Sequence, residues 1–357
     1  MATQMRRPRP RLRRSDCSGP GLRRVRHGRG FVYRDHDGQR VRDPELLERL
    51  RGLAIPPAWR DVWICADPWG HLQATGIDAA GRKQYLYHPR WRERKDREKF
   101  ERMVRFARWL PDLRRRLAAD LGGGEPTREA VLACAVRLLD VGLFRVGSEQ
   151  YADEDHGVGL ATIRRGHVSL RGKAIVFDYP AKGGIRRVQS IDDPLSHELV
   201  RTLRRRRGGG PQLLACREGS GWVPVRSDEV NGYLKRQTEE EFTAKDFRTW
   251  NATVLAAVSL AAGGRDAATG AARKRAINQA VRVVATTLGN TPAVARRAYI
   301  DPRVLDRYLS GWTIAGVVDG DDDLRPADDR GRARLERAVL DLLADERSSP
   351  ALERQAS

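Results

Sequence analysis

The sequence has few cysteines, few histidines and few lysines for its length of 357 residues. Its four cysteines, at positions 17, 65, 134 and 216, lie far apart and form no Cys-x-x-Cys pair. This spacing argues against a disulfide framework and against a zinc knuckle, and it fits a reducing compartment such as the cytoplasm. There are seven histidines and none follows His197, so the last part of the chain has no imidazole for acid–base or metal chemistry.

Long apolar runs are also missing. The longest nearly apolar stretch, Val254 to Ala262, is interrupted by Ser259 and is far short of the roughly 20 residues that span a bilayer. The N-terminal arginines, up to Arg14, are followed by no apolar core, so they do not form a secretory signal. We therefore expect no membrane partner.

Nucleotide and metal motifs are absent as well. The sequence has no Walker A motif and no His-Glu-x-x-His, and Gly28-Arg29-Gly30 lacks the third glycine of a dinucleotide fingerprint. The acidic run from Asp319 to Asp323 is typical of a solvated loop, and no paired aspartates stand at metal-ligand spacing. We expect no cofactor and no bound metal.

The abundant feature is positive charge. Lysine and arginine number 67 against 47 acidic residues, a formal net charge of +20, and the pI is about 10.6. Only eight of the basic residues are lysine, a bias that codon usage alone can produce. Basic residues spread along a chain of this pI indicate a partner with a phosphate backbone.

Changes in composition and the positions of turn-forming residues divide the chain into four parts. Residues 1–20 form an Arg/Pro-rich tail that we expect to be disordered, and residues 21–92 alternate short β-like runs with Gly, Pro and Asp-Gly turns. Dense charge at 92–97 marks the expected boundary with a mainly helical domain, 93–315. An acidic loop and a last amphipathic helix make up 316–357.

Local signals predict individual elements. Asp43-Pro44 begins a helix, Thr243 with Asp246 resembles a capping box, and Thr291-Pro292 is a further helix start. Three strand-like runs predict an isolated meander at 167–170, 174–179 and 185–191, and the chain after it reads as almost entirely helical. The expected helices cover 43–51, about 98–117, 127–140, 195–207, 228–237, 244–261, 271–288, 302–310 and 332–345.

Four segments combine residues suited to phosphodiester chemistry. They are Phe144-Arg145-Val146-Gly147-Ser148-Glu149, the Ala181-Lys182-Gly183-Gly184 turn, Lys245-Asp246-Phe247-Arg248-Thr249-Trp250, and Leu288-Gly289-Asn290-Thr291-Pro292 with Tyr299 seven residues later. A tyrosine can form a phosphoester that conserves the energy of the cut bond, and cationic neighbours can activate its phenol, whose ordinary pKa is about 10. Arginine suits the non-bridging phosphate oxygens, and lysine can protonate a leaving oxygen.

These four segments, in this order and approximate spacing, resemble the active-site motifs of type IB DNA topoisomerases of the poxvirus-like and bacterial short form. The segments Ile55–Trp59, Gly70–Gly76 and Gly81–Pro89 resemble the small DNA-clamping domain of the same family. The resemblance runs from about Gly21 to Tyr308. It implies an α+β chain, with a small antiparallel β-rich N-terminal domain and a larger, mainly α-helical catalytic domain that contains a small three-stranded sheet.

The resemblance also implies roles. Tyr299 matches the nucleophile that forms a 3′-phosphotyrosyl link, Arg145 and Arg248 match the two catalytic arginines, and Lys182 matches the general acid. Asn290 stands where the poxvirus form has histidine; it can donate a hydrogen bond to a phosphate oxygen but cannot transfer a proton. Tyr308, the nearest rival nucleophile, lacks the Leu-Gly-Asn-Thr-Pro lead-in. Expected DNA contacts are Tyr85, Tyr87, Arg82, Tyr151 and Lys245.

The implied function is relaxation of supercoiled double-stranded DNA without ATP or metal, by a monomer that encloses the duplex in the cytoplasm, at the nucleoid of a GC-rich bacterium. Two alternatives remain open. A tyrosine recombinase uses the same covalent chemistry, but usually shows His-x-x-Arg where this chain has Lys245-x-x-Arg248, and its N-terminal domain is usually helical. A non-catalytic basic DNA-binding protein explains the charge but not the ordered motif set.

Overall fold

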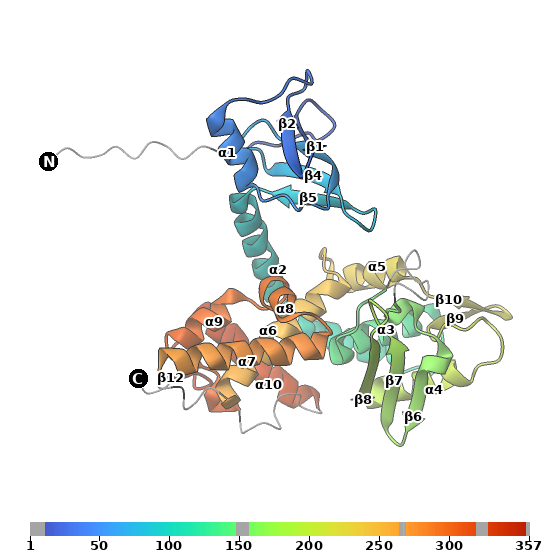
Figure 1. Ribbon diagram of the computed structural model, residues 1–357. Coiled ribbons are helices and arrows are strands. Elements are labelled where there is room, and N and C mark those ends of the chain that lie inside the picture. Colours follow the sequence, from blue (N-terminus) through green and yellow to red (C-terminus); the bar gives the residue numbers. More distant parts are fainter. Residues whose placement is uncertain (1–10, 148–156, 264–266, 268, 319–327, 355–357) are drawn as a thin grey trace. The chain divides into compact units, whose positions relative to one another are not determined.

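The computed structural model describes residues 11–147, 157–263, 267, 269–318 and 328–354 (Figure 1). The chain divides into two compact units, residues 1–101 and 102–357. The first is β-rich and the second is mainly helical, as the α+β expectation requires.

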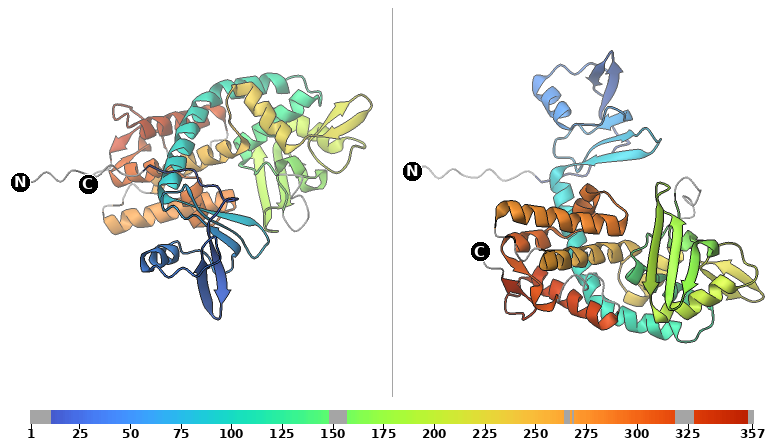
Figure 2. Two further views of the ribbon diagram at one scale, coloured as in Figure 1. Left: turned by 90° about the horizontal axis from the view of Figure 1, so that it is seen from above. Right: turned by 60° about the horizontal axis from the view of Figure 1, so that its bottom comes forward.

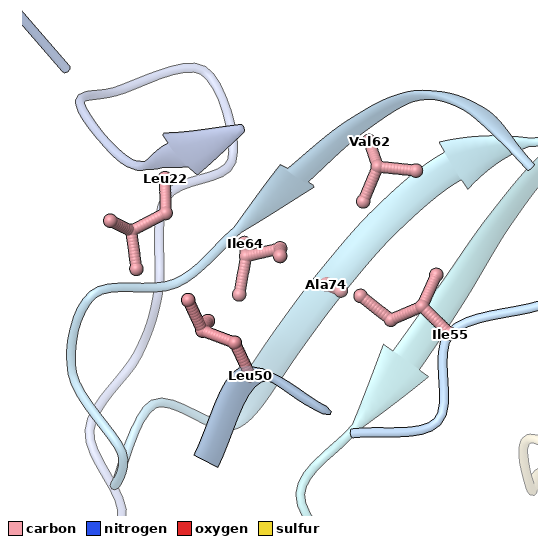
Figure 3. Packing of buried hydrophobic residues seen from close by; sticks show 6 residues of the cluster. All are labelled: Leu22, Leu50, Ile55, Val62, Ile64 and Ala74. Atoms are coloured by element: carbon pink, nitrogen blue, oxygen red, sulfur yellow. The ribbon is translucent and has the colours of Figure 1, made fainter. Parts of the chain in front are cut away.

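The first unit is built on a five-stranded antiparallel sheet with strand order β2-β1-β3-β4-β5. Helix α1, Pro44–Gly52, begins as predicted, because the Asp43 carboxylate accepts a hydrogen bond from Glu45 N and Pro44 occupies the first turn. Its Leu50 packs with side chains of the sheet and of the loop after α1 in a small core (Figure 3). The strands are β1 Leu22–His27, β2 Gly30–Arg34, β3 Arg60–Ile64, β4 Leu72–Ile77 and β5 Lys83–Tyr87.

Part of the N-terminal segment is ordered, contrary to the expectation of a disordered tail at 1–20. Arg13 forms a parallel bridge with Gly70, and Ser15 N donates a hydrogen bond to His71 Nδ1 at 2.9 Å. Cys17 packs against the buried Trp63 and its neighbours. Residues 11–20 therefore pack against the first unit. The prediction was wrong for them because an Arg/Pro-rich composition gives no sign of backbone pairing with the loop before β4. Residues 1–10 lie outside the described residues.

A single long helix, α2, runs from Pro89 to Leu121 through the boundary expected at 92–93. The dense charge there belongs to the exposed face of this helix, where Arg94 and Lys95 both pair with Glu98. The compact units divide instead between Glu101 and Arg102, within the helix. Charge density marked a solvated helix face, not a linker.

The second unit surrounds the buried helix α6, Ala244–Gly263, which packs beside α7, Gly270–Leu288 (Figure 1). Most side chains of α6 and of α3, Arg128–Gly142, are buried, as expected for central helices. The remaining helices are α4 Pro194–Arg205, α5 Ser227–Thr238, α8 Pro292–Ala298, α9 Pro302–Leu309 and α10 Asp329–Ala344. Each predicted helix has a counterpart whose ends differ by a few residues, except that α2 begins at Pro89, well before the expected start at about residue 98.

The predicted meander is present as β6 Val168–Arg171, β7 Ala174–Pro180 and β8 Arg186–Asp192, with α4 packed against β7 (Figure 2). Two small two-stranded sheets interrupt the region that the sequence predicts to be helical. One is a hairpin of β9 Ala215–Glu218 with β10 Gly221–Pro224, and the other pairs β11 Trp312–Thr313 with β12 Glu353–Arg354, from the two sides of α10. Strands of two to four residues are too short to show an alternating pattern.

A buried ion network joins α10 to the centre of the second unit. The Asp140 carboxylate on α3 pairs with Arg114 at 2.8 Å and with Arg332 at 2.6 Å, and Arg114 also pairs with Glu336 at 2.7 Å. Asp140 is fully buried, and its cationic neighbours hold its pKa below the ordinary value despite that burial. The network fixes α10 and α2 against α3, and Arg145 follows the C-terminal end of α3.

Candidate active site

Arg145 is held in an irregular segment that follows α3. The helix ends at Leu143 in a left-handed conformation, with φ of 56°. Two residues later the chain runs beside residues 159–161, where Leu160 N donates to Arg145 O at 2.8 Å and Ala161 N donates to Val146 O at 2.7 Å. Gly147 and Gly159 allow this close approach, because a Cβ on Gly159 would lie 2.2 Å from Gly147 Cα.

Tyr299 stands at the end of the short helix α8. Gly289 ends α7 in the left-handed conformation, Thr291 caps α8 by accepting from Val294 N, and Pro292 occupies the first turn, as the sequence predicts. Thr253 Oγ1 on α6 donates to Tyr299 O at 3.2 Å. The tyrosine is 9% exposed and lies under the guanidinium of Arg248, with Cζ 5.3 Å from the ring centroid.

Three arginines from distant parts of the chain donate hydrogen bonds to three successive carbonyls at the end of α7. Arg187 Nη2 bonds Thr287 O at 2.8 Å, Arg248 Nη2 bonds Leu288 O at 2.9 Å, and Arg145 Nη2 bonds Gly289 O at 3.2 Å. The last carbonyls of a helix lack intrahelical partners and carry partial negative charge, so they favour cations. The end of α7 thus gathers positive charge immediately before Asn290.

Asn290 is oriented by one of these arginines. Arg145 Nη2 donates to its side-chain Oδ1 at 2.6 Å. This contact commits the amide oxygen and leaves Nδ2 as the free donor, which is buried and has no hydrogen-bond partner among the residues that the structure describes. Asn290 can therefore donate to a phosphate oxygen, as the resemblance implies.

The cations change the acidity of the tyrosine. Burial raises the pKa of Tyr299, but the charge of Arg248, with smaller effects from Arg145 and Lys245, outweighs burial and brings the pKa below its ordinary value. Burial lowers the pKa of Arg248 to about 10, so its cation is still the main form at neutral pH. The arrangement stabilises a phenolate, and hence favours Tyr299 as a nucleophile.

Lys182 lies in the predicted turn between β7 and β8, where Gly183 and Gly184 have φ of 79° and 72°. Its side chain is exposed and borders a cavity that Arg145 also lines. Lys182 N is only 2.5 Å from the position that a Cβ on Gly157 would take, so the segment after residue 156 fits tightly under this turn. Lys182 and Arg145 thus border the same cavity, which Tyr299 does not line.

The expected DNA contacts fall into two groups. Lys245 lies one helical turn before Arg248 on α6 and is exposed. Tyr85 and Tyr87 lie on one face of β5 with their rings stacked at 6.2 Å, and Tyr85 is 46% exposed. Arg82, in the turn before β5, pairs with Asp78 at 2.9 Å. Tyr151 and the acidic run Asp319–Asp323 lie outside the described residues.

Two residues near the site escaped the sequence analysis. Arg187 and Gln189 point inward from β8, on the same face as the buried Ile191, whereas Arg186 and Val188 are exposed. The period-two burial of a strand with one protected face could have identified them, because Ile191 fixes which alternate positions face inward.

The described residues contain neither a candidate metal centre nor a candidate membrane span. In that part of the chain, no three His, Cys, Asp or Glu side chains are grouped so that they could hold a metal ion. No described helix is both long and apolar enough to cross a membrane.

Comparison with known proteins identifies the family of this chain. Residues 88–310 match the family described as eukaryotic DNA topoisomerase I, catalytic core, and residues 30–78 match the bacterial DNA topoisomerase IB N-terminal domain. The chain is 28% identical to DNA topoisomerase 1B of Acanthamoeba polyphaga mimivirus over 293 residues, which is 81% of this chain and 87% of the relative. It is 20% identical to vaccinia virus (strain Copenhagen) DNA topoisomerase 1B over 74% of this chain and 82% of the relative. Fission yeast DNA topoisomerase 1 is 29% identical over 46% of this chain, but over only 19% of the yeast protein. Because the first match alone spans more than half of the sequence and a second lies within the β-rich unit, the chain belongs to the type IB DNA topoisomerase family.

Proposed function

We propose that this DNA topoisomerase relaxes supercoiled duplex DNA through a covalent link to Tyr299. The Tyr299 Oη attacks a backbone phosphorus, its bond to phosphorus forms, and the bond to the 5′-oxygen breaks. The 5′-hydroxyl strand rotates and then attacks the 3′-phosphotyrosyl ester, which restores the phosphodiester and the free phenol. The ester conserves the bond energy, so the cycle consumes no ATP.

The observation that carries this proposal is the buried phenol beside Arg248, with a pKa below its ordinary value. Tyr308 provides the contrast, because burial raises its pKa. A nucleophile needs its conjugate base at working pH, and of these two tyrosines Tyr299 has the environment that favours it.

Arg145, Arg248 and Asn290 are proposed to stabilise the transition state. Each is held by contacts that the end of α7 provides, so the donors are fixed before DNA binds. Donors held in position stabilise the charge that builds on the non-bridging oxygens without reorganising, and removal of one such donor costs on the order of 10²-fold in rate. Asn290 contributes a neutral donor where a histidine would contribute a charged one.

Lys182 is proposed as the acid that protonates the leaving 5′-oxygen. None of the described residues that line the cavity beside its turn is acidic, and Arg145 borders the same cavity. Lys182→Ala should slow cleavage of a 5′-oxygen substrate strongly and of a 5′-sulfur substrate much less, because a thiolate leaves without protonation. Equal slowing of both substrates would contradict this role.

The deciding experiment is relaxation of a supercoiled plasmid in EDTA without ATP, with Tyr299→Phe and Tyr308→Phe beside the wild type. We expect wild type and Tyr308→Phe to relax the plasmid and to form a denaturant-resistant protein–DNA adduct, and Tyr299→Phe to do neither. Relaxation by Tyr299→Phe would overturn the assignment of the nucleophile. Recombination between defined paired sites, without plasmid relaxation, would favour a recombinase.

We further propose that the protein acts as a monomer on double-stranded DNA in the bacterial cytoplasm, at the nucleoid. The stacked Tyr85 and Tyr87, together with Arg82, Lys245 and Tyr151, are proposed DNA contacts. The binding constant for DNA should fall as salt rises: for each tenfold rise in salt concentration, log K should fall by about 0.9 for every phosphate that the protein neutralises. Tyr85→Ala and Lys245→Ala should weaken binding, and sedimentation of the complex should give a one-to-one ratio with a short duplex.

A further inference from the structure

A second group of cations lies next to the proposed reaction centre. A cavity of about 300 Å³ is bordered by Arg145, Lys182 and Arg187, and none of the described residues that line it is acidic. Arg186 also borders it, but its guanidinium forms a two-pronged pair with Asp178 at 2.8 and 2.6 Å. Neither Tyr299 nor Arg248 lines this cavity.

Arg187 has only neutral hydrogen-bond partners among the described residues. Its Nε donates to Gln189 Oε1 at 2.9 Å and its Nη2 donates to Thr287 O at 2.8 Å. Burial lowers the pKa of Arg187, and repulsion from Arg145 lowers it further. A partly buried cation that is crowded by another cation is stabilised when an anion binds between them.

Gln189 also borders this cavity and supplies a second donor. Its Oε1 accepts from Arg187, which leaves Nε2 as the free end of the amide. Nε2 is buried and has no hydrogen-bond partner within the described part of the chain. A buried donor without an acceptor is costly, so the pair of Arg187 and Gln189 is incomplete until an acceptor such as a phosphate oxygen arrives.

We propose that Arg187 and Gln189 bind a second phosphate of the cut strand, the one next to the scissile phosphate on the side of the leaving 5′-hydroxyl. This inference rests on the proposed function, because Lys182, the proposed acid for that leaving oxygen, borders this cavity and Tyr299 does not. The site would hold the leaving strand through its nearest backbone charge. Arg187 is then positioned by the same helix end as Arg145 and Arg248, but serves the neighbouring phosphate.

The test compares single charge removals on protein and DNA. Binding of short duplexes is measured with Tyr299→Phe protein, in which no cleavage occurs, and each duplex carries one neutral methylphosphonate at a different position of the cut strand. In the Arg187→Gln protein we expect affinity to fall on the order of 10-fold for unmodified DNA. We call the loss of affinity that one methylphosphonate causes its penalty. The methylphosphonate next to the scissile phosphate, on the side of the leaving 5′-hydroxyl, should lower the affinity of the protein with Arg187 by a similar factor. It should hardly lower the affinity of Arg187→Gln any further.

Matched variants complete the design. Arg201→Ala removes an exposed arginine that pairs with Glu198 on α4, outside the cavity, and should leave every methylphosphonate penalty unchanged. Like Arg187→Gln, Gln189→Leu should reduce the loss of affinity caused by the methylphosphonate on the leaving side. Arg187→Lys should retain part of that loss, because lysine keeps the charge. Gln189→Leu and Arg187→Lys also serve if Arg187→Gln fails to fold.

Two results would overturn the inference. If Arg187→Gln removes the penalty at the scissile phosphate itself, Arg187 is a third ligand of the reacting group. If it changes no single penalty, the cavity binds no phosphate. Neither result would affect the proposed function, which depends on whether Tyr299→Phe abolishes the covalent adduct in a separate assay.

Discussion

Substitution of Gly159 by alanine should separate Arg145 from its place in the active site. A Cβ at Gly159 would lie 2.2 Å from Gly147 Cα and 2.3 Å from Gly147 N, and both atoms are backbone. Non-bonded carbons need about 3.5 Å, so the two segments must open by roughly 1.3 Å. Gly159 has φ of −114°, which alanine adopts without strain, so the effect is purely one of space.

That displacement is expected to slow covalent adduct formation by on the order of 10²-fold, because a misplacement of about 1 Å in a reacting site costs about that much. The Arg145 and Val146 carbonyls bond Leu160 and Ala161, so they cannot keep their position while residue 159 moves. DNA affinity should change little, since the proposed DNA contacts Tyr85, Tyr87 and Lys245 lie on β5 and α6.

The measurement is single-turnover formation of the adduct on a short end-labelled duplex at saturating enzyme, with affinity measured separately. Gly166→Ala is the control: no atom lies within 4 Å of its Cβ position, and it should cleave at the wild-type rate. Thermal unfolding of both variants checks that the fold is kept. A folded Gly159→Ala protein that cleaves within about threefold of wild type would refute the argument that this contact positions Arg145.

Two further predictions follow from the charges. Asp140→Asn should destabilise the second unit by about 3–5 kcal/mol, because Arg114 and Arg332 lose a fully buried counter-ion. Calorimetry should show Tm lowered by about 10 °C or more. The control Glu98→Gln, in an exposed ion pair, should leave Tm unchanged. The cleavage rate should rise with pH and level off as the Tyr299 phenol ionises. Because the charge of Lys245 lowers the pKa of Tyr299, Lys245→Ala should move the plateau to higher pH. An unchanged pH profile would contradict the electrostatic argument.

The positions of most elements are determined by the sequence itself. Asp43 with Pro44 and Thr291 with Pro292 begin helices, because a cap needs only a side chain and a backbone N–H a few residues away. The β6–β8 meander follows from short connections between adjacent strands. Local patterns also gave the motif order that resembles the topoisomerase family, which the family matches confirm.

The tertiary structure alone decided which charges meet. Arg145 and Gly289 are 144 residues apart, and Arg187 and Thr287 are 100 apart, so no local pattern predicts that they share one helix end. The ordered residues 11–20, the β9–β10 hairpin and the burial of Asp140 likewise depend on partners far along the chain. Hydrogen bonds at a helix start are set by neighbouring residues, but an arginine finds its carbonyl or carboxylate only after the chain has packed. For that reason the contact of Arg187 with the end of α7 became visible only in the fold.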